Sequence, residues 1–166
     1  MTLIPVVSAL ERQAVSQLAD EIWHQHYPSI ISTTQIDYML ATFQSPQAIA
    51  EQIETGYRYF LIFGHSSELQ GYLSININID ERSLFLSKFY LLEQFRGQGL
   101  ARKALFDIER MAQDAQLESI YLTVNKNNRI ALNAYQKMGF VVVDDIVTDI
   151  GAGYVMDDYK MLKKLN

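Results

Sequence analysis

The sequence contains no cysteine, three histidines and three prolines, and it has no long uninterrupted apolar run. The missing cysteine excludes disulfides, thiolate metal sites and a cysteine nucleophile, and it is compatible with a reducing, cytoplasmic location. No segment approaches the roughly eighteen consecutive apolar residues of a membrane-spanning helix, so we expect no membrane span. The first residues, "MTLIPVVSALERQ", lack a basic stretch followed by an apolar one, so we expect no signal peptide.

Basic charge is also scarce, because the net charge at pH 7 is −5. Nucleic-acid-binding proteins depend on a basic face, so this balance argues against that class. His24 and His26 are two residues apart and would face different sides of a helix, so we expect no metal site. With 166 residues and no repeat or linker, the chain is expected to form one domain covering residues 1–166.

The first third of the chain has helical periodicity. Apolar residues recur every three to four positions after Ser8, and Pro28 interrupts the pattern. Two further short helices are predicted in "QIDYMLATF" and "SPQAIAEQIETG", where serines precede the apolar residues and a proline stands at the start of the second.

The middle and the end of the chain alternate strands and helices. The segments "YRYFLIF", "LQGYLSINI" and "SLFLSKFYLL" are predicted strands joined by short turns, which favours an antiparallel meander. A helix over residues 100–115, the strand "SIYLTV", a short helix in "NNRIALNAYQKMGF" and two final strands follow. The strand–helix–strand order over residues 84–124 implies one parallel pair within the sheet.

The stretch "LLEQFRGQGLARKAL" links a predicted strand to a predicted helix and contains Gly97 and Gly99. The first N–H groups of a helix have no intrahelical partner, and a glycine-rich turn lets a phosphate approach them closely. Arg96, Arg102 and Lys103 add positive charge nearby. The alternative is a tight turn without a ligand. The stretch matches neither the Walker motif nor a dinucleotide-binding unit.

Two motifs together resemble the GNAT superfamily of acetyl-CoA-dependent N-acetyltransferases. The loop from Arg96 to Ala101 fits the pattern Arg/Gln-x-x-Gly-x-Gly/Ala, and "NNRIALNAYQKMGF" follows about thirty residues later. The resemblance implies an α+β, α/β-sandwich-like fold in a single domain. Its mixed, mostly antiparallel sheet would have about seven strands, splayed between strands 4 and 5 and flanked by helices.

The same resemblance implies an acetyl-CoA site. Strand residues 89–91 would pair with the pantetheine arm, and N–H groups of residues 97–102 would hold the pyrophosphate. The expected cofactor-binding residues are Phe89, Tyr90, Leu91, Arg96, Gly97, Gln98, Gly99, Leu100, Ala101, Arg102 and Asn128. Tyr135 matches the family's general acid, which protonates the leaving thiolate. It also lies on an apolar helix face with Ile130 and Met138 and could instead be a core residue.

The general base is left open. Family members often carry a carboxylate on the fourth or fifth strand, and Ser87 and Thr123 stand at those positions here. Lys88 and Glu93 are nearby in the sequence, in directions that strand alternation does not fix. Proton removal would then use a water chain or a residue from another segment. The candidates are His24, His26, Tyr27, Asp157 and Asp158.

The end of the chain is acidic, with Asp144, Asp145, Asp149, Asp157 and Asp158 around the sequence "GAG". These carboxylates either attract an amine acceptor, such as a polyamine or a peptide amine, or form an ordinary surface hairpin. The expected partners are acetyl-CoA and this amine, and a homodimer is compatible with the resemblance. A second interpretation is a non-catalytic acyl-CoA-binding module, and a third is a nucleotide-phosphate protein that would bind ATP or GTP.

Overall fold

The computed structural model describes residues 1–165, which form two compact units. The first unit contains Met1–Asn76 and Lys88–Phe106. The second contains Ile77–Ser87 and the chain from Asp107 to the end of the described residues. Strands β3 and β4 and helix α4 each run from one unit into the other along the chain.

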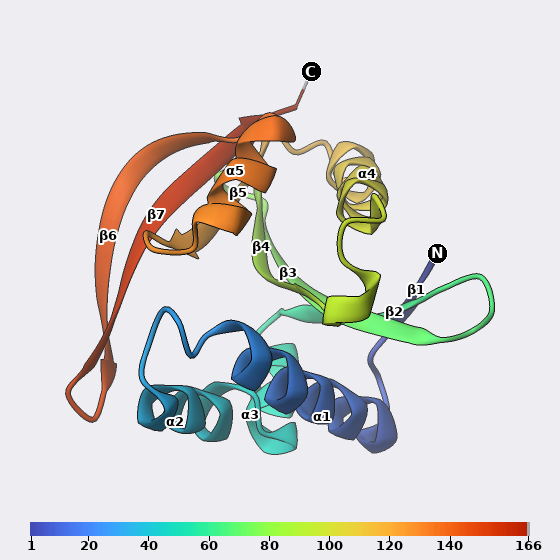
Figure 1. Ribbon diagram of the computed structural model, residues 1–166. Helices are drawn as coiled ribbons and strands as arrows, with labels where there is room; N and C mark the ends of the chain where they lie inside the picture. The colour runs from blue at the N-terminus through green and yellow to red at the C-terminus, as the bar shows by residue number, and fades with distance from the viewer. Residues whose placement is uncertain (166) are drawn as a thin grey trace. The chain divides into compact units, whose positions relative to one another are not determined.

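Three helices of the first unit lie side by side (Figure 1): α1 (Ala9–His26), α2 (Thr33–Phe43) and α3 (Pro46–Glu54). Each begins after a serine whose hydroxyl accepts a hydrogen bond from a backbone N–H of the first turn. Such a cap satisfies one of the N–H groups that the helix itself leaves without a partner. The three helix starts were therefore predicted correctly from local sequence.

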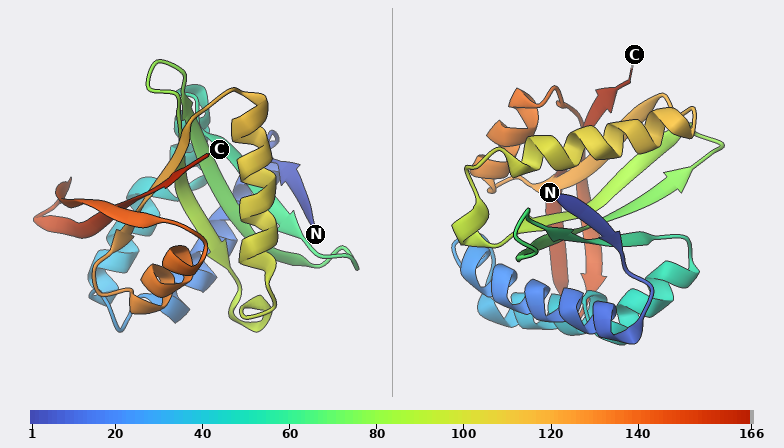
Figure 2. Two further views of the ribbon diagram at one scale, coloured as in Figure 1. Left: turned by 90° about the horizontal axis from the view of Figure 1, so that it is seen from above. Right: turned by 90° about the vertical axis from the view of Figure 1, so that its right-hand side faces the viewer.

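The strands of the first unit form an antiparallel meander. β1 (Thr2–Pro5) pairs with β2 (Arg58–Phe63), and β2 pairs with β3 (Leu69–Asn78). The three helices lie along one side of these strands (Figure 2). β4 (Ser83–Leu91) enters this unit at Lys88, and the short 3-10 helix η1 (Glu93–Phe95) follows it.

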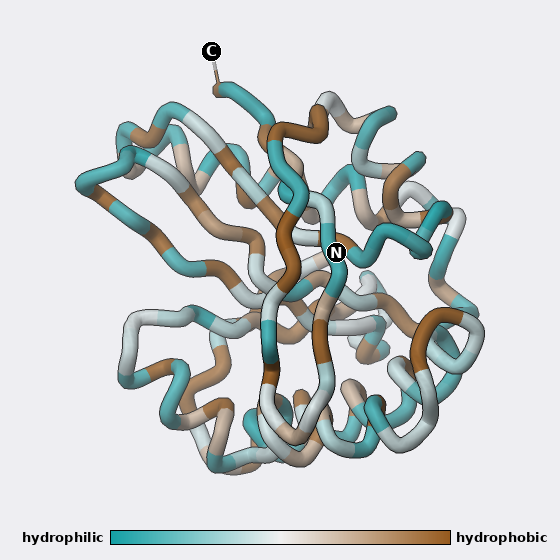
Figure 3. Tube along the Cα trace, turned by 90° about the vertical axis from the view of Figure 1, so that its left-hand side faces the viewer, coloured by the Kyte–Doolittle hydropathy of each residue, from teal (hydrophilic) through white to brown (hydrophobic). Residues whose placement is uncertain are grey.

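The second unit is built around β5 and a long hairpin. Its elements after α4 (Leu100–Asp114) are β5 (Ser119–Asn125), α5 (Arg129–Lys137), β6 (Val141–Gly151) and β7 (Tyr154–Lys164). β7 lies between β5 and β6 and is antiparallel to both. Along the β6–β7 hairpin, short bands of hydrophobic and hydrophilic residues follow one another (Figure 3).

The predicted fold class is confirmed. Within residues 1–165 the strands form one seven-stranded sheet in the order β1-β2-β3-β4-β5-β7-β6. In this order β4 is parallel to β5, with Ser83–Phe85 opposite Ser119–Tyr121. The splay between β4 and β5 beyond these residues stays a prediction. The single domain over residues 1–166 also stays a prediction. No helix in the described part of the chain is both long and apolar enough to cross a membrane.

One detail of the sequence interpretation is wrong. One alternative placed Tyr135 with Ile130 on an apolar face of α5 that could be core, but the side chain of Ile130 is 79% exposed. A helix of nine residues has barely more than two turns, so its apolar spacing defines the buried stripe poorly.

Candidate active site

The glycine loop has the backbone conformation that an anion-binding turn needs. Gly97 and Gly99 have φ angles of +75° and +76°, in a region that residues with a Cβ rarely adopt. A Cβ built on either glycine would meet no heavy atom of the described residues within 4 Å. Both glycines are exposed, so the space beside the loop is open to a ligand.

The helix that follows directs its N-terminus into this space. The N–H of Lys103 donates to the carbonyl oxygen of Gly99 at 3.2 Å, which closes the first turn of α4. The N–H groups of residues 100–102 precede this bond and have no partner within the helix. Arg102 and Lys103 are exposed beside them. The partial positive charge of the helix N-terminus and the full positive charges of Arg102 and Lys103 therefore lie close together.

Arg96 connects the loop to the end of β4. Its Nε donates to the carbonyl oxygen of Leu91 at 3.0 Å, and the amide of Gln98 donates to the carbonyl oxygen of Gln94 at 2.9 Å. These bonds brace the turn from within. The predicted residues of β4 and of the loop, which all lie in the first unit, are thus brought together.

The backbone of β4 approaches β3 closely at Gly71. A Cβ on Gly71 would lie 2.1 Å from the carbonyl oxygen of Tyr90, far inside van der Waals contact. The Tyr90 carbonyl therefore faces β3. Since backbone groups of successive strand residues point to opposite edges, those of Phe89 and Leu91 point away from β3.

An aromatic cluster fixes the Tyr90 side chain. Its ring centroid lies 5.4 Å from those of Trp23 and Tyr72, and its hydroxyl lies 3.0 Å from the hydroxyl of Tyr27. Burial raises the pKa of Tyr72 far above its usual value, so this phenol stays neutral. The cluster holds the end of β4 against α1 in the first unit.

In the second unit, the predicted residues Asn128 and Tyr135 lie on α5. The side-chain oxygen of Asn128 accepts from the N–H of Ala131 at 3.2 Å and caps the helix. Tyr135 is partly exposed, and its ring stands edge-on to the buried ring of Phe140 at 5.6 Å. Contact with Phe140 fits a packing role, and partial exposure leaves the ring accessible, so both interpretations of Tyr135 stay open.

Known proteins resemble this chain over most of its length. The model of the acetyltransferase (GNAT) family matches residues 15–140. An uncharacterised N-acetyltransferase of Mycobacterium tuberculosis is 31% identical over 121 residues, which are 73% of this chain and 76% of that protein. The chain belongs to the GNAT family.

Solved GNAT structures share its fold. The PaiA N-acetyltransferase of Thermoplasma acidophilum, solved in complex with coenzyme A, matches with a TM-score of 0.79 at 21% identity, over 99% of this chain and 100% of that one. A mutant of the spermidine N-acetyltransferase SpeG of Vibrio cholerae matches with a TM-score of 0.68 at 19% identity, over 99% and 95% of the two chains. The expectation of an acyltransferase of the GNAT class is thereby confirmed.

The two strand positions where GNAT proteins often carry a carboxylate remain without one. Ser87 is partly exposed in β4, and Thr123 is exposed in β5. Neither hydroxyl acts as a base at neutral pH.

The candidates on α1 differ in their protonation. Nδ1 of His24 lies 2.8 Å from the carbonyl oxygen of Asp20, and Nε2 lies 2.8 Å from Oδ1 of Asp37. These two contacts raise the pKa of His24 and favour the imidazolium, which cannot accept a proton. Burial, with a smaller effect of Arg96, lowers the pKa of His26 and keeps this ring neutral.

The two carboxylates of β7 also differ. Asp157 is exposed, and its Oδ1 lies 2.6 Å from Nζ of Lys126, which also pairs with Asp145. Asp158 is partly buried, and its Oδ1 has no hydrogen-bond partner among the described residues. Burial, and to a lesser degree the charge of Asp157, raises the pKa of Asp158 to about 6, while Lys126 acts in the opposite direction.

Lys88 has a property that its sequence position did not reveal. Its Nζ lies 3.3 Å from Oε1 of Gln52 and 5.7 Å from the ring centroids of both Tyr57 and Tyr59. Burial lowers the pKa of this lysine to about 8. The only sequence signal was a lysine placed inside a mostly apolar strand, which could have indicated a partly desolvated amine.

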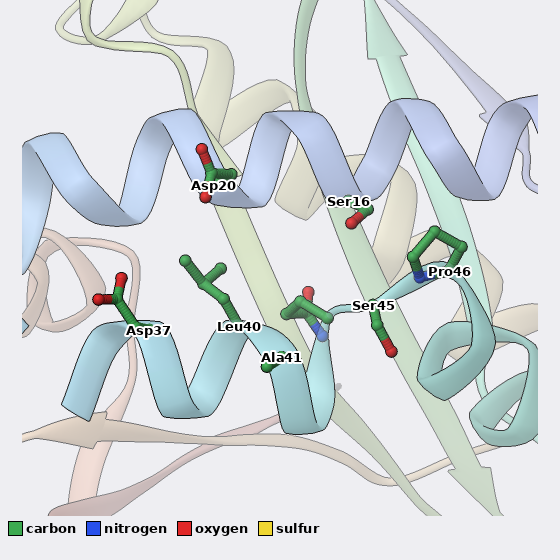
Figure 4. A pocket seen from close by; sticks show the side chains of 8 residues that line it. Ser16, Asp20, Asp37, Leu40, Ala41, Ser45 and Pro46 are labelled. Atoms are coloured by element: carbon green, nitrogen blue, oxygen red, sulfur yellow. The ribbon is translucent and has the colours of Figure 1, made fainter. Parts of the chain in front are cut away.

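A pocket of about 290 Å³ opens between α1 and α2. Ser16 and Asp20 reach it from α1, and Asp37, Leu40 and Ala41 from α2 (Figure 4). None of the predicted cofactor-binding residues lines it, so we assign it no part in the site. The described residues contain no group of histidines and carboxylates arranged to hold a metal ion.

Proposed function

We propose that this protein transfers an acetyl group from acetyl-CoA to a primary amine, by direct attack of the amine on the thioester. The observation that carries the proposal is the glycine loop at the start of α4, with its positive φ angles and its open surroundings among the described residues. Coenzyme A in the PaiA structure gives further support.

The residues fit acetyl-CoA in three ways. The N–H groups of residues 97–102 would bind the pyrophosphate, assisted by the positive end of α4. The backbone edge at Phe89 and Leu91 that points away from β3 would pair with the amide groups of the pantetheine arm, as strand residues pair with a neighbour, beside the bond from Arg96 to the Leu91 carbonyl. From the second unit, Asn128 would contact the cofactor arm and Tyr135 would protonate the thiolate that leaves.

Direct attack requires a neutral amine and no enzyme nucleophile, which suits a chain without cysteine. Two observations support a cationic acceptor such as a polyamine or a peptide amine. The hairpin carries exposed Asp144 and Asp149, and SpeG, which shares the fold, is a spermidine N-acetyltransferase. A homodimer and a cytoplasmic location belong to the same proposal, and light scattering and cell fractionation test them.

The loop is tested by calorimetric titration with acetyl-CoA, ATP and GTP. Gly99→Glu should abolish acetyl-CoA binding, because it fills and charges the phosphate space. Gly153→Glu is the matched control, since Gly153 also has a positive φ (+79°) and open surroundings among the residues described. Unchanged affinity in Gly99→Glu would refute the loop assignment, and binding of ATP or GTP in place of acetyl-CoA would refute the donor.

The second candidate function is a binding module without turnover, which Ser87 and Thr123 at the usual carboxylate positions favour. A thiol-release assay with acetyl-CoA over polyamines, amino acids, aminoglycosides and peptides separates the two functions. Turnover of any amine supports the transferase. Binding of acetyl-CoA without turnover of any acceptor supports the module.

A further inference from the structure

The two faces of the β5–β7 pair have different surroundings within the second unit. Ile120, Leu122 and Val124 are buried, and β7 places Lys163, Met161 and Tyr159 opposite them. Lys163 forms a salt bridge with Glu109 of α4 and donates to the carbonyl oxygen of Met138, just after α5. This face is therefore the one that α4 and α5 cover.

Asp158 lies on the other face. It stands directly opposite Asn125, while Lys160 stands opposite Thr123, so these four residues share the face turned away from α4 and α5. Asp158 is thus the diagonal cross-strand neighbour of Thr123, within about 8 Å. Thr123 stands where GNAT proteins often carry a carboxylate, and Asp158 is a carboxylate on the adjacent strand.

The carboxylate of Asp158 has an acceptor position to spare. Its Oδ1 is buried and has no hydrogen-bond partner in the described part of the chain. A buried acceptor without a partner is destabilising, so such groups call for a functional explanation. Its pKa of about 6 leaves it ionised at neutral pH but close enough to accept a proton.

The neighbouring carboxylate cannot do the same. Asp157 alternates to the opposite side of β7, where Lys126 pairs with it and with Asp145. Nζ of Lys126 also lies 5.4 Å from the ring centroid of Tyr159. The two salt bridges occupy Lys126 on that side and leave Asp158 without a salt bridge of its own among residues 1–165.

We propose that Asp158 is the general base of the acetyl transfer, an inference that rests on the function proposed above. Asp158 takes one proton from the ammonium of the acceptor, and the nitrogen lone pair forms the C–N bond to the thioester carbon. The C–S bond breaks with its electron pair on sulfur, and the thiolate leaves as the thiol after taking up one proton. The second nitrogen proton, released as the amide forms, goes to solvent.

The charged groups around Asp158 in the second unit influence its pKa and therefore the pH dependence of the activity. From β7 these are Asp157 and Lys160, and from the end of β5 Lys126, which Asp145 of β6 partly neutralises. Nζ of Lys160 lies over the ring of Tyr121, 4.5 Å from its centroid, on the same face as Asp158. The residues paired directly with Asp158 are uncharged, namely Asn125 and Ile146.

The test measures kcat/KM against pH with spermidine and with a peptide that has a free N-terminus. The wild type should lose activity below about pH 6, and Asp158→Asn should lower kcat by about a hundredfold or more and abolish this acid limb. Asp157→Asn is the matched control and should keep the acid limb. The Kd of acetyl-CoA should be the same in all three proteins, which shows that the donor site is intact.

An Asp158→Asn enzyme that keeps the wild-type kcat and acid limb overturns the base assignment while the transferase function stands. A wild type that binds acetyl-CoA but turns over neither amine overturns both. Asp158→Ser serves as a second variant if the asparagine protein does not fold. A carbon-13 titration of the Asp158 carboxyl group gives an independent readout: a midpoint near 6 supports the proposal, and a midpoint near 4 refutes it.

Discussion

Replacing Asp158 by asparagine should make the folded protein more stable at neutral pH. The wild-type carboxylate is charged there, partly buried, next to Asp157, and has one oxygen without a partner among the described residues. Asparagine has nearly the same shape and carries no charge. The variant therefore removes the charge with little change in packing.

The size of the effect follows from the pKa. Burial, then Asp157, raises the pKa of Asp158 from 3.8 to about 6. At about 1.4 kcal/mol for each tenfold difference, an unscreened charge would destabilise the folded state by about 3 kcal/mol. The side chain keeps contact with water, which screens it, so we expect about half of this value, about 1.5 kcal/mol.

The direction of the pKa shift determines the pH range in which Asp158 changes the stability of the protein. Because the folded-state pKa of Asp158 is higher than the unfolded value, the folded protein binds the proton more tightly. This stabilisation is complete below pH 3.8 and is lost as the pH rises through about 6. The advantage of Asp158→Asn over the wild type should therefore grow by about 1 kcal/mol between about pH 4.5 and pH 7.5.

Urea unfolding of both proteins at the two pH values measures this difference directly. In a thermal melt at the higher pH, the variant should unfold about 3–5 °C above the wild type. Asp157→Asn is the control and should show no such gain, because it removes the salt bridge to Lys126. An equal advantage at both pH values, or a less stable Asp158→Asn protein at neutral pH, would refute the reasoning.

Three further predictions concern other parts of the chain. Gly71→Ala should lower the free energy of unfolding by about 3 kcal/mol, because its Cβ would overlap the Tyr90 carbonyl, and unchanged urea unfolding would contradict this. His24→Gln should destabilise the protein by a few tenths of a kcal/mol at acid pH and not at alkaline pH. Because the pKa of His24 is raised in the folded protein, its contacts add stability below the unfolded-state pKa of 6.5. That stability is lost as the pH rises through the folded-state pKa, so an effect independent of pH argues against the contacts to Asp20 and Asp37. Tyr135→Phe should lower kcat about ten- to a thousandfold without changing the unfolding temperature, whereas wild-type kcat with lower stability would make Tyr135 a packing residue.

Local chemistry explains why much of the fold was predictable. Serine caps, a proline in the first turn and positive-φ glycines act on the residues next to them, so the starts of α1, α2 and α3 and the turn at Gly97–Gly99 could be predicted from short segments. Packing acts at long range. The exposure of Ile130 and the close approach at Gly71 depend on which elements meet, and sequence spacing does not determine that.

By itself, the sequence identified the GNAT family, through the glycine loop and the motif on α5. Those signals are contiguous because a phosphate site of the kind proposed above needs only the backbone of a single turn and the start of a single helix. Only the tertiary structure distinguished the candidate bases. Asp157 and Asp158 are adjacent in sequence, yet pairing with β5 turns one towards Lys126 and leaves the other partly buried with an oxygen unpaired among the described residues. The availability of a carboxylate depends on burial and on partners from distant segments, and these exist only after the strands have paired.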